Sequence, residues 1–399
     1  MSHRLANLTL SVYLPTFILS LCRGLLIPVL PVYASSFGVS YSLIGLILAG
    51  EAVGTLFADV PAGGLLRRLG GKWAMVLGIS LVGLSVLALV WAGTVWEVLG
   101  YRFAAGVGGA LWNLSRHTYI TEATKLVERG RAIALFGGTN RLGVFAGPAL
   151  GGIIATAYGL TAPFLVFVAL SVLALVVVAL FTEKPESPIG VDALKHRATE
   201  KYHFIEILTQ HYRVLASAGS GQLLAQMIRA SRQVIIPLYG ASILGLDLQA
   251  VGLIMSVSSF IDFSMFYPAG LLMDRLGRKY AILPCFFLQA VGMAFVPLAT
   301  GTLSLLACAS VMGLGNGLGS GTMMTLGADL APQDGLGEFL GVWRLIGDGG
   351  TMGAPLAVGA IADLVSLPTA ALVMAGVGCC AVGIFALKVP ETRPASKTG

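Results

Sequence analysis

Runs of about 20 apolar residues, separated by short polar turns, follow one another along the whole chain. A helix of that length matches the thickness of a bilayer's hydrocarbon core, about 30 Å. The composition agrees, because 56% of the 399 residues are hydrophobic and only 11% are charged. Soluble chains carry about 25% charged residues. The chain is therefore predicted to be an all-α, multi-pass membrane protein.

Twelve membrane-spanning helices are predicted from these runs and the turn residues between them. The single long polar connection lies at 183–212, so we predict an N-terminal six-helix bundle over 1–182, a linker over 183–212 and a C-terminal bundle over 213–399. Apolar spacing at 202–212 suits a helix on the membrane surface, the alternative being the start of span seven. The predicted spans are 10–33, 43–66, 73–92, 98–121, 131–156, 163–182, 213–239, 250–273, 280–298, 303–327, 338–362 and 369–388.

Basic residues lie on one side of the predicted membrane. The loops after spans 2, 4, 6 and 8 contain Lys and Arg, whereas those after spans 1, 3, 5, 7, 9 and 11 contain none. The positive-inside rule then predicts that both termini are cytoplasmic, in the inner or plasma membrane of the cell. The net charge of +6 could also indicate nucleic acid, but the basic residues are scattered through short loops. No nucleic-acid partner is expected.

Other chemistry is not indicated. The five cysteines fall inside apolar runs and are expected to be free thiols, and the five histidines show no metal-ligand grouping. No phosphate-cradling loop is present, because the Gly-rich stretch at 313–321 lacks the Lys-Ser/Thr of such loops. We expect no enzyme activity, cofactor or metal, and a monomer whose partners are a small-molecule substrate, protons and lipid.

The chain contains two copies of one unit. Pro61–Ala74 recurs as Pro268–Ala281, with nine of fourteen residues identical at an offset of 207. Further Gly and Pro residues match in the same register, which chance recurrence in Gly-rich spans does not explain. A parallel repeat of this size is typical of secondary transporters built from two related halves. The matching pairs are Gly38 with Gly245, Gly106 with Gly313, Gly108 with Gly315, Gly130 with Gly337, Gly143 with Gly350, Pro148 with Pro355 and Gly152 with Gly359, and Pro31-Val-Tyr33 matches Pro237-Leu-Tyr239 one position out of step.

Three motifs resemble those of the major facilitator superfamily. The loop after span 8 carries its signature, span 4 has Arg102 followed by Gly106 and Gly108, and span 5 resembles the motif of the drug:proton antiporters. The resemblance implies twelve helices in two pseudo-symmetric six-helix bundles that work by alternating access. One departure is Arg67, where the first loop of the family has Asp. The loop motif comprises Gly270, Leu272, Asp274, Arg275, Gly277, Arg278 and Lys279, and the span 5 motif comprises Gly143, Gly147, Pro148, Gly151 and Gly152.

The resemblance also places charged loops beside neighbouring spans, where ion pairs are predicted. Two pairs would join the halves and hold the cytoplasmic side shut, and two would lie within a half. Arg67 is the repeat equivalent of Asp274 and Glu338 that of Arg131, so both charges are reversed together and complementarity is kept. The alternative is a set of solvated charges worth about 0–1 kcal/mol each. The predicted pairs are Asp274 with Arg131, Arg67 with Glu338, Arg68 with Glu122, and Arg275 with Asp329.

Ionisable residues within the spans are expected to have a charged or polar partner or a role in function, since each costs roughly 2.5–3.5 kcal/mol of free energy at mid-membrane. Similar depths favour two pairs between the halves, Arg141 with Asp262 and Asp59 with Arg344. Arg23 and Glu51 are also expected at one depth. Static ion pairs are the alternative, although such pairs add little stability. The residues concerned are Arg23, Arg102, Arg116, Arg141, Arg229, Arg232, Arg344, Glu51, Asp59, Asp262 and Asp348.

Arg23 and Arg229 are repeat equivalents at mid-depth, so with Arg232 they are predicted to form an anion clamp. For Arg232 the alternative is that it snorkels to the outer interface. Arg102, Tyr33 and Tyr239 complete the candidate substrate-binding set, with ordinary helix packing as the alternative for the aromatic residues. Proton coupling needs a carboxylate whose proton affinity changes on desolvation or on losing an arginine. Asp262 is the first candidate, followed by Asp348 and Glu51.

The function predicted is proton-coupled efflux of a small organic solute. The excess of arginines favours an anionic solute or an anionic part of it. Proton symport of an organic anion or metabolite into the cell is the first alternative. A transporter-like membrane sensor or a lipid flippase is the second.

Overall fold

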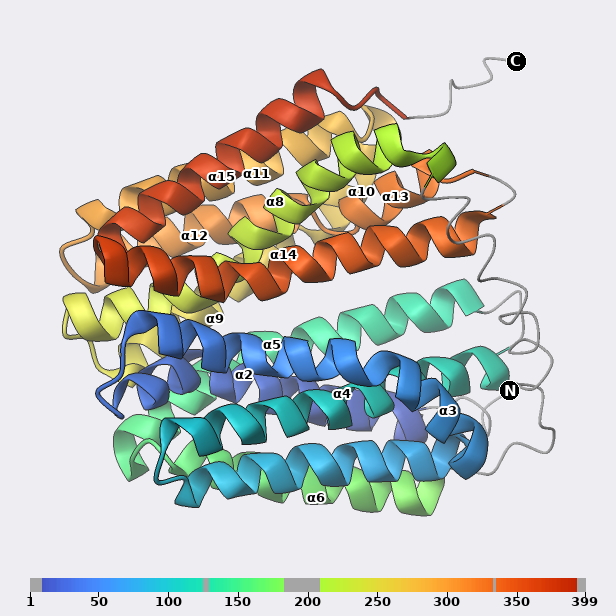
Figure 1. Ribbon diagram of the computed structural model, residues 1–399, viewed down its shortest axis with the longest axis vertical. Coiled ribbons are helices and arrows are strands. Elements are labelled where there is room, and N and C mark those ends of the chain that lie inside the picture. Colours follow the sequence, from blue (N-terminus) through green and yellow to red (C-terminus); the bar gives the residue numbers. More distant parts are fainter. Residues whose placement is uncertain (1–8, 125–128, 183–208, 333–334, 393–399) are drawn as a thin grey trace. The chain divides into compact units, whose positions relative to one another are not determined.

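The computed structural model describes residues 9–124, 129–182, 209–332 and 335–392. All regular elements of these residues are helical (Figure 1). Each of the twelve predicted spans lies along helical segments of the described residues. The all-α fold predicted from the hydropathy pattern is therefore confirmed. Most of the predicted linker, 183–208, lies outside the described residues.

The first of two compact units comprises residues 1–194 together with 245–256. Its α3 contains two predicted spans, joined through Gly70, whose φ is 78°. Within the unit α3 packs against α4, and α2 packs against α5. The elements of its first segment are η1 (Thr9–Tyr13), α2 (Leu14–Ser35), α3 (Tyr41–Ala88), η2 (Leu89–Trp91), α4 (Val95–Ala123), α5 (Arg129–Tyr158) and α6 (Ala162–Phe181).

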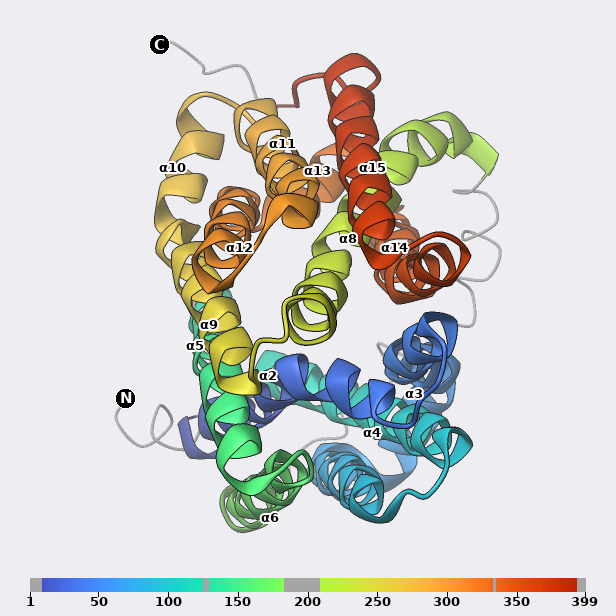
Figure 2. The same cartoon turned by 90° about the vertical axis from the view of Figure 1, so that its left-hand side faces the viewer.

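The second unit comprises residues 195–244 and 257–399. Two of its predicted spans are each divided into two helices, one at Met265 and one at Gly319–Gly321. Within the unit α11 packs against α12 and α15, and α8 packs against α14 (Figure 2). The elements are α8 (Tyr212–Leu238), η3 (Tyr239–Ile243), α9 (Leu248–Ser264, shared with the first unit), α10 (Phe266–Arg275), α11 (Lys279–Phe295), η4 (Val296–Leu298), α12 (Thr302–Leu318), α13 (Thr322–Leu330), α14 (Leu336–Leu364) and α15 (Leu367–Leu387).

The sequence repeat is also a repeat of backbone geometry. Gly70 and Gly277, at equivalent positions of the repeated loop, both have positive φ, 78° and 125°. Gly38 and Gly245 form a second equivalent pair, with φ of 67° and 64°. Glycine adopts this region without the steric cost that a side chain brings. The same turns are therefore built into both copies.

Close helix packing repeats as well. A Cβ atom added to Gly108 would lie 2.8 Å from the carbonyl oxygen of Gly78, and one added to Gly315 would lie 2.7 Å from that of Cys285. Gly78 and Cys285 are themselves 207 residues apart. Gly108 thus allows α4 to approach α3 closely, and Gly315 allows α12 to approach α11, the equivalent pair of helices in the second unit. Small residues have this role in membrane bundles.

The glycines of the span 5 motif lie in two contacts of α5. A Cβ on Gly143 would lie 2.7 Å from the carbonyl oxygen of Phe17 in α2. Pro148 and Gly152 instead approach the first half of α9, where Ser256 accepts a hydrogen bond from the Ala149 N–H at 2.8 Å. The motif therefore brings α5 against α2 and against the start of α9. The second contact is the one that the family resemblance implies between spans 5 and 8.

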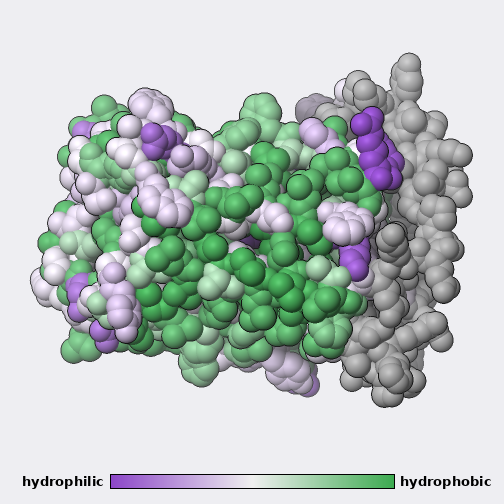
Figure 3. All heavy atoms as spheres, turned by 90° about the horizontal axis from the view of Figure 1, so that it is seen from below, coloured by the Kyte–Doolittle hydropathy of each residue, from purple (hydrophilic) through white to green (hydrophobic). Residues whose placement is uncertain are grey.

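Hydrophobic side chains cover the lipid-facing surface. Leu165, Val172, Leu173 and Leu180 of α6 are between 49% and 71% exposed. Figure 3 shows a broad apolar band on the face of the first unit to which α6 belongs. Eight described helices are long and apolar enough to cross a membrane. Burial of this apolar surface in lipid avoids the free-energy cost of exposing it to water.

Candidate functional site

Two arginines surround one carboxylate inside the first unit. Arg102 of α4 donates a hydrogen bond to one oxygen of Glu51 in α3, and its side chain is only 9% exposed. Nη2 of Arg23 in α2 lies 3.9 Å from the other carboxylate oxygen, with the Arg23 side chain 48% exposed. Arg23 and Glu51, which the sequence only predicted to lie at one depth, are thus in contact. Arg102, assigned to substrate binding from the sequence, lies closer to Glu51 than Arg23 does.

A third buried arginine of the first unit, Arg116, lies farther along α4. Its guanidinium lies over the rings of Phe136, at 4.4 Å, and Trp112, at 5.2 Å, and donates to Asn113 Oδ1 at 3.0 Å. The residue is 7% exposed, and its Nε has no hydrogen-bond partner among the described residues. The sequence reasoning gave Arg116 no role. Its spacing of fourteen residues from Arg102, nearly four helical turns, was the available signal.

Arg229 is the repeat equivalent of Arg23, yet it is held differently. Its Nη2 donates to the Gly319 carbonyl at 3.0 Å and lies 3.6 Å from Sγ of Cys285. Its guanidinium also lies over the Phe286 ring, 5.0 Å from the centroid. Arg229 is thus anchored within its own unit, whereas Arg23 is half-exposed.

Arg232 lies one turn farther along α8 and is 7% exposed. Its Nη1 donates to Ser258 Oγ at 3.2 Å, and that hydroxyl donates to the Ala309 carbonyl at 2.5 Å. The side chain is therefore buried against α9, and its snorkelling to the outer interface stays a prediction.

Asp262 of α9 accepts a hydrogen bond of 2.6 Å from the Asn316 amide of α12. Arg232 lies within electrostatic range of the same carboxylate. Asn316 is a site residue that the sequence reasoning missed. The signal was a polar amide in a span, at the position where the first copy has Gly109.

The two tyrosines of the candidate binding set occupy equivalent structural positions. Tyr33 is 6% exposed and donates to the Leu89 carbonyl at 2.6 Å, whereas Tyr239 is 3% exposed and donates to the Pro297 carbonyl at 3.2 Å. In each unit the tyrosine hydroxyl therefore ties one helix to the end of another. Substrate contact by either residue stays a prediction.

Most of the predicted gating pairs join residues of different units and stay predictions: Arg141 with Asp262, Asp59 with Arg344, Arg67 with Glu338, and Asp274 with Arg131. The side chains of Arg131 and Glu122 lie outside the described residues, so the Arg68–Glu122 pair also stays a prediction. Within α14, Nε of Arg344 lies 3.7 Å from Oδ2 of Asp348, and both side chains are mostly exposed.

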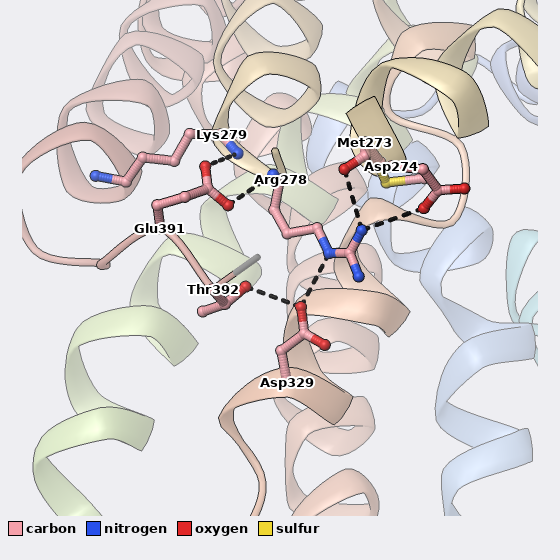
Figure 4. Close-up of polar contacts among 7 residues, drawn as sticks. All are labelled: Met273, Asp274, Arg278, Lys279, Asp329, Glu391 and Thr392. Atoms are coloured by element: carbon pink, nitrogen blue, oxygen red, sulfur yellow. Dashed lines mark hydrogen bonds and ion pairs between the residues drawn. The ribbon is translucent and has the colours of Figure 1, made fainter. Parts of the chain in front are cut away.

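The loop motif forms a charged cluster in the second unit (Figure 4). Nε of Arg278 lies 3.0 Å from Oδ2 of Asp329, and its Nη1 lies 3.4 Å from Asp274 and donates to the Met273 carbonyl at 3.1 Å. The sequence assigned Arg275 to Asp329, and the structure places Arg278 on that carboxylate. The predicted Arg275–Asp329 pair stays a prediction.

The segment after α15 completes this cluster (Figure 4). The Glu391 carboxylate accepts the backbone N–H groups of Arg278, at 2.8 Å, and Lys279, at 3.0 Å, at the start of α11. Thr392 donates to Asp329 at 2.8 Å. A carboxylate at this position satisfies amide groups that a helix leaves unpaired. Glu391 was also missed from the sequence, although Pro390-Glu391-Thr392 echoes Pro185-Glu186-Ser187 after the first bundle.

Comparison of the sequence with known proteins identifies the family of this chain. The family model described as Major Facilitator Superfamily matches residues 12–221 and 218–399. The chain is 24% identical over 359 residues to an uncharacterised MFS-type transporter of Methanocaldococcus jannaschii, covering 89% of this chain and 91% of that protein. It is 27% identical over 367 residues to a protein of Lactococcus lactis named as a homologue of the multi-drug resistance efflux pump PmrA, covering 86% and 85%.

Solved structures share the fold at low sequence identity. The D-xylose–proton symporter has a TM-score of 0.76 at 17% identity, over 97% of this chain and 98% of its own. A POT family transporter has the same TM-score at 13% identity, over 95% and 96%.

Proposed function

Because the chain belongs to the Major Facilitator Superfamily, we propose that it is an antiporter that exports a small organic solute in exchange for protons by alternating access. That it is a multi-pass membrane transporter of small molecules, and not an enzyme, follows from the family itself. The exchange for protons and the outward direction are the proposal. We also propose that both termini are cytoplasmic, because of the asymmetry in Lys and Arg between the loops.

One observation supports the exchange for protons. In each unit, a carboxylate lies inside the helices and contacts polar or cationic side chains. Glu51 lies between Arg23 and Arg102, and Asp262 lies beside Asn316 and within range of Arg232. Ionisable groups in spans are costly, so groups that change partners between two states account for their presence better than static pairs do. A carboxylate that loses its cation gains proton affinity, which couples its protonation to the conformational change.

Export is supported by the span 5 motif and by similarity to proteins named for multidrug efflux. Besides the relative from Lactococcus lactis, the chain is 27% identical over 286 residues to the protein named Multidrug resistance protein 2 of Bacillus subtilis, covering 70% of each chain.

Everted membrane vesicles with an imposed proton gradient test the proposal. Addition of a transported solute to everted membranes should dissipate the gradient in an antiporter and should fail to do so in a symporter. Counterflow of a labelled solute is expected for either kind of transporter. Its absence across a broad panel of organic solutes would contradict transport and favour a membrane sensor.

A further inference from the structure

The first unit lacks a pair of side chains that the second unit has. Gly109 and Asn316 are equivalent positions of the repeat, as are Thr55 and Asp262. In the second unit the Asn316 amide donates to the Asp262 carboxylate at 2.6 Å. The first unit has neither the amide nor the carboxylate at these positions.

Arg23 occupies the place of the missing donor. A Cβ atom added to Gly109 would lie 3.5 Å from Nη2 of Arg23 and 4.0 Å from the hydroxyl oxygen of Thr55. The Arg23 guanidinium therefore lies over Gly109, next to the position where the second unit carries a carboxylate. Its contact with Glu51 is long, at 3.9 Å, and its side chain is 48% exposed. A guanidinium has five N–H donors, so this contact leaves Arg23 able to bind a further acceptor.

Arg116 provides a second cation on the same face of α4, seven residues after Gly109. It is 7% exposed, its Nε has no hydrogen-bond partner among the described residues, and it is close enough to Arg23 for the like charges to repel. Arg23 and Arg102 contact the Glu51 carboxylate, and Arg116 adds a further buried positive charge within electrostatic range of Arg23, so three cations accompany this one carboxylate. An anion bound beside Arg23 and Arg116 would relieve this excess.

We propose that the Arg23 guanidinium over Gly109, with Arg116 farther along the same helix α4, forms a carboxylate-binding subsite for an organic anion. The inference rests on the proposed function, since the anion is the transported solute or part of it. The Thr55 hydroxyl lies 2.9 Å and 3.1 Å from the backbone carbonyls of Glu51 and Gly106, to which its single proton is directed. The guanidinium groups therefore supply the donors, and a carboxylate can accept two parallel bonds from one guanidinium.

Matched pairs of ligands test the subsite by thermal shift on the purified protein. Salicylate is compared with salicylamide, and indole-3-acetate with indole-3-acetamide. In at least one pair the carboxylate is expected to raise the melting temperature more than its amide. The apparent affinity for that carboxylate should fall about 10- to 100-fold in Arg23→Gln, as expected for a lost charge-assisted hydrogen bond. Arg213→Gln is the matched control and should retain the preference, because Arg213 lies exposed at the start of α8, where its side chain contacts Tyr212.

A second variant tests the same idea without removing a cation. Thr55→Asp supplies an internal carboxylate at the position that Asp262 holds in the second unit, and should abolish the carboxylate preference. Thr55→Val, of similar size and without the charge, should keep it. Equal responses to carboxylate and amide in every pair, or a preference that survives Arg23→Gln, would overturn the subsite. A carboxylate preference in a protein whose substrates leave the proton gradient unchanged would instead overturn the proposed antiport and leave the subsite standing.

Discussion

Asn316 of α12 donates a hydrogen bond of 2.6 Å to Asp262 of α9, and this amide has no counterpart in the first unit, where Gly109 occupies the equivalent position. The two copies therefore carry their acids differently. The first unit places Glu51 between Arg23 and Arg102, whereas in the second unit the position equivalent to Glu51 is Ser258 and the acid lies one turn farther along the helix. The duplicated framework is thus combined with two different charged centres.

Replacement of Asn316 by Ala should destabilise the protein, because it removes the amide that donates to the Asp262 carboxylate inside the second unit. Loss of a hydrogen bond to a charged group costs about 1.5–3 kcal/mol, and the partial burial of this pair places the expected loss at or below that range. The loss is measured as a fall in the melting temperature in detergent. The double variant Asn316→Ala with Asp262→Ala should lose less than the sum of the single changes. Additive losses would contradict the coupling of the two residues.

Glu51→Ala should destabilise the protein, because it leaves the Arg102 guanidinium buried without its carboxylate. Removal of one partner of a buried ion pair costs about 3–5 kcal/mol, and the partial exposure of Glu51 places the expected loss at or below that range. The loss is measured as a fall in the melting temperature in detergent. The double variant Glu51→Ala with Arg102→Leu should lose less than the sum of the single changes. Additive losses would show that the two residues are not coupled.

Alanine at Gly108 or Gly315 should lower stability by similar amounts, about 1–3 kcal/mol, because each added methyl group meets the carbonyl of the neighbouring helix. A Cβ atom added to Gly341 of α14 would meet no neighbouring atom within 4 Å. Gly341→Ala is therefore the matched control and should be neutral or slightly stabilising. Melting temperatures of the three variants provide the comparison. A loss in one unit without a comparable loss in the other would argue against equivalent packing.

Glu391→Ala should loosen the loop between α10 and α11. The carboxylate accepts two backbone N–H groups at the start of α11, and loss of such a cap costs about 0.5–2 kcal/mol. The expected readout is faster amide hydrogen exchange at Arg278 and Lys279, with little change in distant helices. Glu391→Gln, which retains one acceptor oxygen, should show a smaller effect. Unchanged exchange in both variants would contradict the capping role.

Arg67→Glu should slow transport if Arg67 pairs with Glu338 as the repeat predicts. The reversal places two negative charges where the sequence predicts a pair, and Glu338→Arg should then restore complementarity. Transport rates of the single and double variants, measured at low and high salt, test this pairing, because exposed charges are screened by salt. The prediction fails when the double variant is no faster than the single one.

The sequence by itself determined the helices, the repeat and the turns of this protein. Apolar run length sets where a chain can cross a bilayer, and the turn glycines Gly70 and Gly277 recur in register because the backbone requires positive φ there. These are local properties of the chain, so they can be read without the fold.

Only the tertiary structure decided which charged groups meet. It placed Arg102 on Glu51, Arg278 on Asp329 and Asn316 on Asp262. Such pairings depend on the rotation of each helix about its axis and on which neighbour it packs against. Residues close together in one loop, such as Arg275 and Arg278, have the same chemistry and nearly the same depth. Hydropathy and spacing therefore identify the charged residues of a span but do not distinguish their partners.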